Sequence, residues 1–209
     1  MLPLLLLAAA PAAAAPTPID AERAFAADAQ ALGQWTAFRK WAADDATMFV
    51  PKPVKAQAFL KDRKDPPKAI DWWPTASFVS CDGSVAVNTG GWKRPDGTVG
   101  YFSTVWRRQT DGGWKWIVDG GDTLTTPRKR PTTPVTKRAT CPDTRMLLGM
   151  QVESRGDTVD QGRSNDGTLF WDWVVDPGGK RSFRAWIWDG RKIRSVIADR
   201  IAAPTPAAS

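Results

Sequence analysis

The sequence predicts an α+β protein in which N-terminal helices precede a curved antiparallel sheet, and a small C-terminal β-meander follows. Three observations predict this class. Apolar residues recur at helical spacings in residues 18–41, Asp-Gly turn signals divide residues 75–119 into strand-like runs, and a second set of such runs follows a Pro- and Thr-rich stretch. Helices followed by strands that short turns connect are typical of this class.

The helical pattern starts at Pro18 and Asp20, which are favourable residues for a first turn. Five apolar residues then share helical spacings: Phe25, Leu32, Trp35, Phe38 and Trp41. Gly33 is expected to divide this region into two helices or to bend one. A short strand at 46–50 and a short helix at 55–61 are expected next.

Four strands are expected between the Asp-Gly turns, near residues 76–81, 84–92, 98–109 and 114–119. Short turns make successive strands antiparallel neighbours. Gly90-Gly91 indicates a bulge or bend that curves the sheet. Large apolar side chains occur on both faces of the third of these strands. We therefore expect helices to cover one face, and a partner subunit or the second module to cover the other.

The second module is expected to contain strands near residues 168–175, 180–188 and 191–198. If Val175 faces Lys180, four tryptophans share one face: Trp171, Trp173, Trp186 and Trp188. A sheet of this size is not stable alone, so this face is expected to pack on the first module. Contact with a glycan is the alternative, because tryptophan rings stack on sugars.

The chain divides into five segments. Residues 1–14 are expected to be a secretory signal peptide, because the apolar run is too short to span a bilayer and ends in small residues. Residues 18–124 form the first module, 125–140 a basic linker, 141–201 the β-meander module and 202–209 a disordered tail. The expected location is the bacterial periplasm or the outside of the cell, with no transmembrane segment.

Composition excludes several kinds of chemistry. The 209 residues include 12 Trp, one Tyr and no His, so no histidine-containing triad, imidazole base or histidine-ligated metal is expected. The net charge is +7, but five of the basic residues lie in the linker: Arg128, Lys129, Arg130, Lys137 and Arg138. The two modules are therefore close to neutral, and nucleic acid is not expected as a partner. Neither a metal nor a cofactor is expected.

The two cysteines, Cys81 and Cys141, are expected to form a disulfide in an oxidising compartment. Such a bond would attach the end of the linker to the first sheet. Two free and unrelated buried thiols are the alternative.

Two motifs carry a family resemblance. ADDATMFVP (43–51) leads into a short strand and a small helix, and VWRRQTDGGWKWIVDGG (105–121) crosses a hairpin. Residues 20–122 thereby resemble the nuclear transport factor 2-like superfamily, in its SnoaL-like and ketosteroid-isomerase-like branch. The resemblance implies a cone-like fold, in which helices close over a curved sheet around an apolar pocket. It also implies a homodimer through the outer sheet face. No family resemblance is identified for the second module.

The catalytic residues of the family are not found at the matching positions of this chain. Ketosteroid isomerases place a carboxylate base directly before the proline that ends the ADDAT strand, where this chain has Val50. Their phenolic hydrogen-bond donor falls near Phe25 or Ala26, neither of which can donate. Members with an Asp-His pair have no match, because the chain has no histidine. No catalytic residue is therefore assigned.

Asp119 remains a catalytic candidate. Strand alternation places it near Trp106 and Ile117, where burial would raise the pKa of its carboxyl group. The alternative is a solvated carboxylate in a turn.

A pocket wall is expected to take its residues from the aromatic positions and from one strand face. The ligand-pocket candidates are Trp35, Phe38, Trp73, Tyr101, Trp106, Arg107, Trp116 and Asp119. Ordinary core packing is the alternative for most of the aromatic residues. Arg107 would otherwise pair with a neighbouring tryptophan or a surface acid.

Three functions are compatible with these observations. The leading hypothesis is an exported, non-catalytic protein that binds a small apolar or amphipathic molecule. The alternatives are a carboxylate-dependent hydrolase or isomerase of the SnoaL-like type, and a cell-envelope interaction protein that uses the Trp-rich sheet. An inward carboxylate at position 119 would favour the enzyme, and a packed tryptophan face would exclude the envelope protein.

Overall fold

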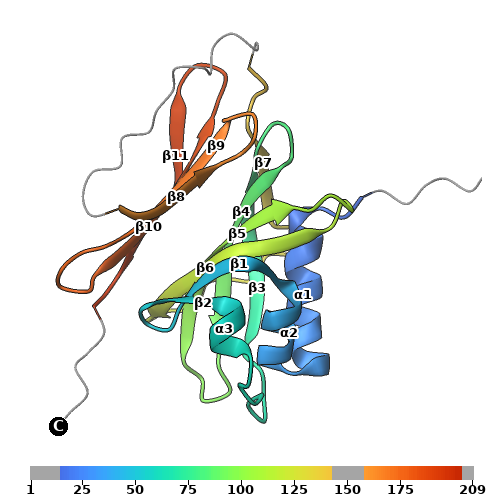
Figure 1. Ribbon diagram of the computed structural model, residues 1–209, viewed down its shortest axis with the longest axis vertical. Coiled ribbons are helices and arrows are strands. Elements are labelled where there is room, and N and C mark those ends of the chain that lie inside the picture. The colour runs from blue at the N-terminus through green and yellow to red at the C-terminus, as the bar shows by residue number, and fades with distance from the viewer. Residues whose placement is uncertain (1–14, 143–157, 204–209) are drawn as a thin grey trace, which may run out of the picture.

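The chain folds into a helical layer, a seven-stranded mixed sheet and a four-stranded antiparallel sheet (Figure 1). This computed structural model describes residues 15–142 and 158–203. The expected signal peptide, 1–14, and residues 204–209 of the expected tail lie outside the described residues. The predicted α+β class is confirmed. Within the described ranges, no helix is long and apolar enough to cross a membrane.

Helix α1 (Pro18–Leu32) begins with a capping box. The Thr17 hydroxyl oxygen accepts a hydrogen bond from the backbone N–H of Asp20, whose carboxylate accepts one from the backbone N–H of Thr17. The buried face of the helix includes Ile19, Glu22 and Phe25, which are spaced three residues apart. The carboxyl group of Glu22 therefore points toward the sheet with its apolar neighbours.

Gly33, at φ 108°, separates α1 from α2 (Gln34–Trp41), as the sequence predicted. The Asp65 carboxylate caps α2 by accepting hydrogen bonds from the backbone N–H groups of Trp35 and Thr36. The short helix α3 (Ala56–Leu60) lies inside the range predicted for it.

The first sheet has the strand order β2-β1-β6-β5-β4-β3-β7. Its strands are β1 (Ala42–Phe49), β2 (Pro53–Lys55), β3 (Asp71–Val79), β4 (Val85–Lys93), β5 (Val99–Arg108), β6 (Trp114–Leu124) and β7 (Val135–Arg138). Strands β3 to β6 form the predicted antiparallel meander. The sheet as a whole is mixed, because β1 is parallel to β6 and β7 is parallel to β3. Strand β7 lies within the predicted linker, at the sheet edge, where prolines are tolerated.

The sheet is irregular beside Gly90, where the sequence predicted a bulge. The shift in register lies on the partner strand, between Pro74 and Ala76 of β3. A Cβ atom on Gly90 would lie 2.0 Å from the carbonyl oxygen of Trp73 and 2.5 Å from the ring of Phe102. Only glycine allows this close approach.

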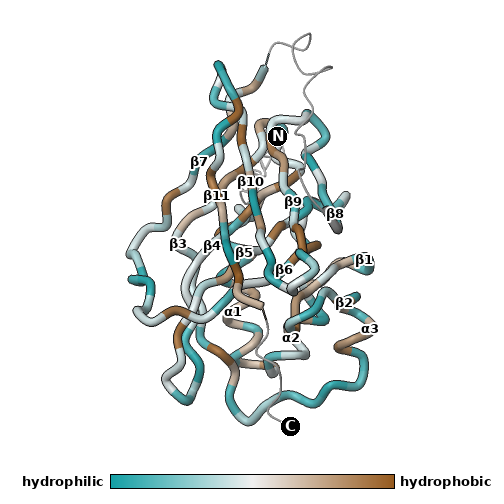
Figure 2. The backbone as a smooth tube through the Cα atoms, turned by 90° about the vertical axis from the view of Figure 1, so that its left-hand side faces the viewer, coloured by the Kyte–Doolittle hydropathy of each residue, from teal (hydrophilic) through white to brown (hydrophobic). Residues whose placement is uncertain are grey.

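Different layers cover the two faces of the first sheet. On the inner face, Trp106 packs in one core cluster with Phe25 of α1. On the outer face, Val105 and Val118 pack in a second cluster with Trp171. Figure 2 shows that the loops beyond these layers are mostly hydrophilic. The second module thus covers the outer face, so the homodimer expected through that face would have to displace it.

The second sheet contains one strand more than predicted, in the order β11-β10-β9-β8. Its strands are β8 (Thr158–Arg163), β9 (Leu169–Val175), β10 (Arg181–Trp188) and β11 (Ile193–Ile201). Strand β8 was not predicted.

The predicted four-tryptophan face is wrong. Val175 pairs with Arg181 and not with Lys180. The backbone N–H of Asp176 donates to the Lys180 carbonyl at 2.9 Å, so Asp176 faces Lys180 and the turn is one residue shorter than predicted. A shift of one residue in register moves every following side chain to the opposite face.

Two of the tryptophans, Trp171 and Trp173, are buried between the sheets, where Trp173 contacts Phe49 with 4.8 Å between ring centroids. Trp186 lies on the other face, with the Arg184 guanidinium 5.2 Å from its ring centroid. The burial of Trp171 and Trp173 contradicts an envelope-interaction role for an exposed Trp-rich sheet face.

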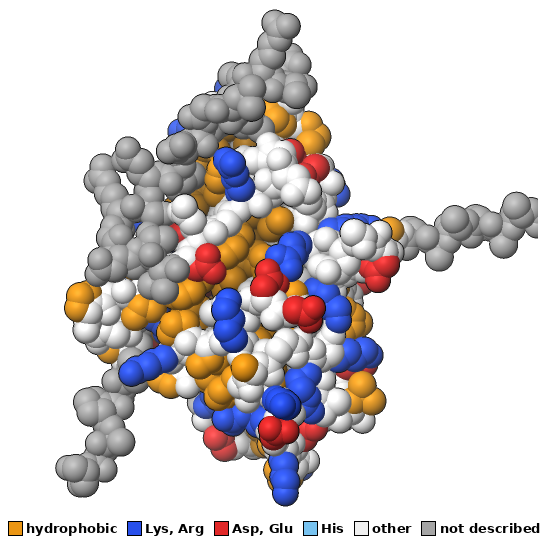
Figure 3. All heavy atoms as spheres, in the orientation of Figure 1, with side chains coloured by type: hydrophobic (Ala, Val, Ile, Leu, Met, Phe, Trp, Pro, Cys, Tyr) orange, Lys and Arg blue, Asp and Glu red, His pale blue; other side chains and the backbone are white. Residues whose placement is uncertain are grey.

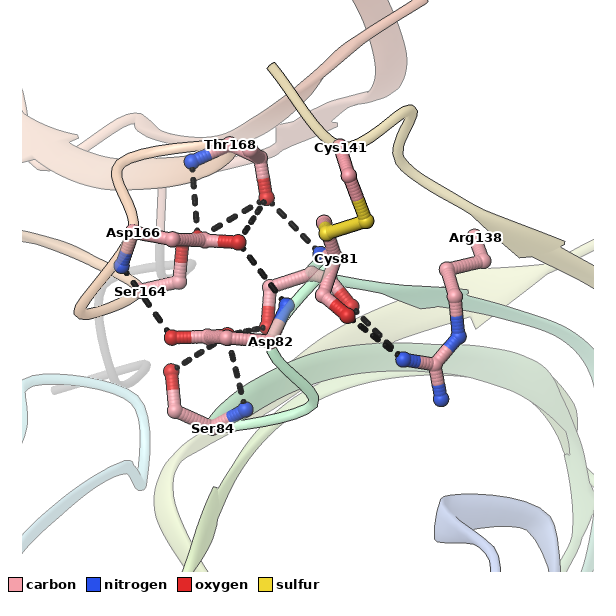
Figure 4. The surroundings of a disulfide bond; sticks show 9 residues. Cys81, Asp82, Ser84, Arg138, Cys141, Ser164, Asp166 and Thr168 are labelled. Atoms are coloured by element: carbon pink, nitrogen blue, oxygen red, sulfur yellow. Dashed lines mark hydrogen bonds between the residues drawn. A yellow bond between two sulfur atoms is a disulfide. The ribbon is translucent and has the colours of Figure 1, made fainter. Parts of the chain in front are cut away.

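The predicted disulfide between Cys81 and Cys141 is confirmed, with 5.0 Å between the Cα atoms (Figure 4). Beside it, two turns exchange hydrogen bonds. The backbone N–H of Asp82 donates to the Asp166 carboxylate at 2.8 Å, and the backbone N–H of Asp166 donates to the Asp82 carboxylate at 3.1 Å. Hydrogen bonds thus attach the second sheet at the turn between β3 and β4, and the disulfide attaches Cys141 to the same turn.

Candidate functional site

A cavity of about 410 Å³ is lined by residues of α1 and α2, by strands of the first sheet and by Arg181 of the second sheet. Its wall is mostly apolar and aromatic, and includes Phe25, Trp35, Phe38, Trp72, Trp92 and Phe102. Five acidic or basic side chains also line it: Glu22, Arg94, Asp119, Asp122 and Arg181. The site therefore combines a large apolar wall with a few polar groups, as small-molecule sites do.

Asp119 lies on β6 opposite Thr104 of β5, and both side chains point inward. The Thr104 hydroxyl donates to Asp119 Oδ1 at 2.6 Å, and Oδ2 has no hydrogen-bond partner among the described residues. Burial raises the pKa of the Asp119 carboxyl to about 6, against the opposing effect of the Thr104 hydrogen bond. Asp119 is thus the cavity carboxyl that the sequence suggested as a candidate, and it is not a solvated turn residue.

Glu22 is a second carboxyl in the cavity wall, and its side chain is almost completely buried. It accepts three hydrogen bonds: from Trp72 Nε1 at 3.0 Å, from Trp106 Nε1 at 2.8 Å and from Asn88 Nδ2 at 3.1 Å. Both of its oxygens are therefore held in fixed positions by side chains of three different strands.

The Glu22 carboxyl has a pKa of about 7, raised mainly by burial. The three hydrogen bonds lower the pKa, and the nearby Asp119 carboxylate raises it further. The cavity thus contains two carboxyl groups that titrate near neutral pH, which is where acid–base groups transfer protons most effectively.

The structure divides the predicted pocket residues into two groups. Trp35, Phe38, Tyr101 and Asp119 line the cavity. Trp106 and Trp116 are fully buried in the core and do not line it, although Trp106 holds Glu22. Alternation places Trp106 on the inner face of β5, but it does not give the depth at which a side chain lies.

The other two candidates, Trp73 and Arg107, lie outside the cavity. Trp73 lines a separate surface groove, beneath the Arg130 guanidinium at 4.5 Å from its ring centroid. Arg107 forms a bidentate ion pair with Asp45, in which Nη1 and Nη2 donate to the two carboxylate oxygens at 2.9 and 2.7 Å. Pairing with a surface acid is the alternative that the sequence offered for Arg107.

Sequence reasoning missed Glu22 and Arg181. Glu22 had a usable signal, because it occupies the buried face of α1 between Ile19 and Phe25, where an acid is unusual. Arg181 had none, because its position depends on how the second sheet docks. Within residues 15–142 and 158–203, no group of three His, Cys, Asp or Glu side chains could hold a metal ion.

No family model and no curated protein matches the chain. Eight chains of solved structures match it. One is a candidate ketosteroid isomerase from Parabacteroides distasonis, with 17% identity and a TM-score of 0.42 over 52% of this chain and 89% of that chain. Another is a candidate aromatic ring hydroxylase from Novosphingobium aromaticivorans, with 17% identity and a TM-score of 0.37 over 52% of this chain and 87% of that chain.

Similarities of this size do not show that this chain has an isomerase or a hydroxylase activity. The described architecture, in which helices cover the inner face of a curved sheet around an aromatic cavity, agrees with the resemblance to the nuclear transport factor 2-like superfamily.

Proposed function

We propose that the chain is an exported, non-catalytic protein that binds one small apolar or amphipathic molecule in the aromatic cavity. The observation that carries the proposal is the cavity itself, whose volume of about 410 Å³ falls within the usual range for small-molecule sites. Val50 lines the cavity where the resemblance would place a catalytic base, which favours binding over catalysis. The disulfide favours export, because such bonds persist in oxidising compartments.

The charge distribution supports a small ligand over a nucleic acid. Figure 3 shows basic and acidic side chains interspersed on one face of the molecule, with hydrophobic side chains gathered between them. Nucleic-acid-binding surfaces instead gather basic residues along one patch or stripe.

Filling part of the cavity is expected to weaken binding. The neutral aromatic probe 2-naphthamide should bind the full chain with 1:1 stoichiometry in a calorimetric titration. Val50→Trp, which places a large ring in the cavity wall, should weaken this binding at least tenfold. Val135→Trp is the matched control, because Val135 is exposed on edge strand β7. Equal binding by both variants would place the probe outside the cavity.

One observation favours a second candidate function, an isomerase-type proton transfer with Asp119 as the base. Asp119 Oδ2 has no hydrogen-bond partner within the described residues, and the raised pKa of its carboxyl suits a base near neutral pH. In this reaction Asp119 would take a proton from the carbon next to a ketone. The electron pair of that C–H bond would then move to the ketone oxygen as an enolate, until a proton returns to carbon.

Asp119→Asn should lower this activity at least a hundredfold, because an amide cannot act as the base. The measurement is the exchange of the α-protons of 2-tetralone for deuterium in D₂O, followed by NMR. Asp111→Asn removes an exposed turn carboxylate and should leave the rate unchanged. If the wild-type chain does not accelerate the exchange, the binding function stands and this candidate is excluded.

A further inference from the structure

Arg181 brings the second sheet into the cavity. It is the first residue of β10, yet its side chain lines the same cavity as Phe49 and Asp122 of the first module. Its guanidinium carbon lies 4.8 Å from the centroid of the Phe49 ring. The cavity wall is therefore completed by a residue outside the cone-like domain.

The Arg181 guanidinium has no hydrogen-bond partner in the described part of the chain. Its Nε and Nη1 atoms are buried without a partner, and it takes part in none of the ion pairs found among the described residues. Burial lowers its pKa, and the neighbouring Asp122 and Tyr101 only partly oppose this effect. Leaving a guanidinium buried and unpaired costs free energy, which a ligand anion would recover.

Arg184, on the same strand, shows the partner that such a group normally has. Its Nε atom donates to the Asp172 carboxylate at 2.8 Å, and its Nη2 atom donates to the other oxygen of the same carboxylate. The planar guanidinium fork matches the two oxygens of a carboxylate in this way. Arg181 presents the same planar guanidinium, but among the described residues no carboxylate is hydrogen-bonded to it.

We propose that Arg181 binds the carboxylate of an apolar monocarboxylic acid whose hydrocarbon or aromatic body occupies the cavity. The aromatic wall suits the apolar body, and the guanidinium suits the anionic end. Asp119 and Asp122 also line the cavity, so a dianion such as a phosphate monoester would meet more repulsion than a monocarboxylate. This inference rests on the proposed binding function and names the ligand class.

The test compares 2-naphthoate with its neutral analogue 2-naphthamide by calorimetric titration of the full chain. Wild-type protein should bind 2-naphthoate more tightly than 2-naphthamide. Arg181→Gln should weaken 2-naphthoate binding roughly tenfold to a hundredfold, the range for charge-assisted hydrogen bonds, and should leave 2-naphthamide binding unchanged. Arg181→Lys keeps the positive charge but not the planar guanidinium. Its affinity for 2-naphthoate should lie between that of the wild type and that of Arg181→Gln.

Lys180→Gln is the matched control, because it removes the same charge from the exposed neighbouring residue. It should bind both probes as the wild type does. If Arg181→Gln binds 2-naphthoate as tightly as the wild type, the role of Arg181 is overturned while the cavity function stands. If wild-type protein binds neither probe, both proposals are contradicted. The thermal unfolding midpoint of each variant verifies that it is folded.

Discussion

Removing the disulfide between Cys81 and Cys141 is expected to lower the free energy of unfolding by about 4 kcal/mol. The bond joins residues that are 60 positions apart, so it restricts a long loop in the unfolded chain. In the native protein it lies beside the turns that attach the second sheet to the first (Figure 4). The loss should therefore include weaker docking of the second sheet.

Urea unfolding of the double variant Cys81→Ser/Cys141→Ser, compared with the wild type, measures this loss. Wild-type protein in excess dithiothreitol serves as the control, and its midpoint should approach that of the double variant. A loss below about 1 kcal/mol would contradict the prediction, because a loop of this length should contribute several times more.

Glu22 is expected to make the folded protein less stable as the pH rises from about 4.5 to above 7. Its carboxyl has a model-peptide pKa of 4.5 and a folded-state pKa of about 7. Between these values the folded chain binds more protons than the unfolded chain, so stability falls with increasing pH. The full difference across this window is about 3 kcal/mol. Asp119 acts in the same direction at slightly lower pH, since the pKa of its carboxyl is also raised.

Urea unfolding at pH 5 and pH 8 measures this dependence, with Glu22→Gln as the comparison. The amide does not ionise, so the variant should show a much smaller difference between the two pH values. It should be less stable than the wild type at pH 5, because the amide nitrogen cannot accept the hydrogen bonds that the carboxyl oxygen accepts. An equal pH dependence in both proteins would mean that another group controls the transition.

The first module was predictable because its signals are local. The helix start beside Pro18, the break at Gly33 and the Asp-Gly turns each depend on a few neighbouring residues. The register of the second sheet was not predictable in this way. The Pro-Gly-Gly sequence between Asp176 and Lys180 allows more than one turn length, and a change of one residue reverses the strand faces.

The cavity was predictable only in part. The resemblance indicated an apolar pocket, and periodicity placed Trp35 and Asp119 toward it. Whether an aromatic ring lines the cavity or fills the core depends on packing depth, as the complete burial of Trp116 shows. Arg181 could not be assigned to the site at all, because its place there follows from the docking of one sheet on another.

The turns that join the two sheets have a consequence for assembly. Each turn has the sequence Ser-X-Asp-Gly followed by Ser or Thr, at 80–84 and at 164–168, and their hydrogen bonds are reciprocal. The backbone N–H of Cys81 donates to the Thr168 hydroxyl, and the equivalent N–H of Asn165 donates to the equivalent Ser84 hydroxyl. Exchange of this kind defines a local two-fold axis, the symmetry of an isologous interface between identical subunits. Because both halves belong to one chain, this interface forms intramolecularly, and dilution does not dissociate it.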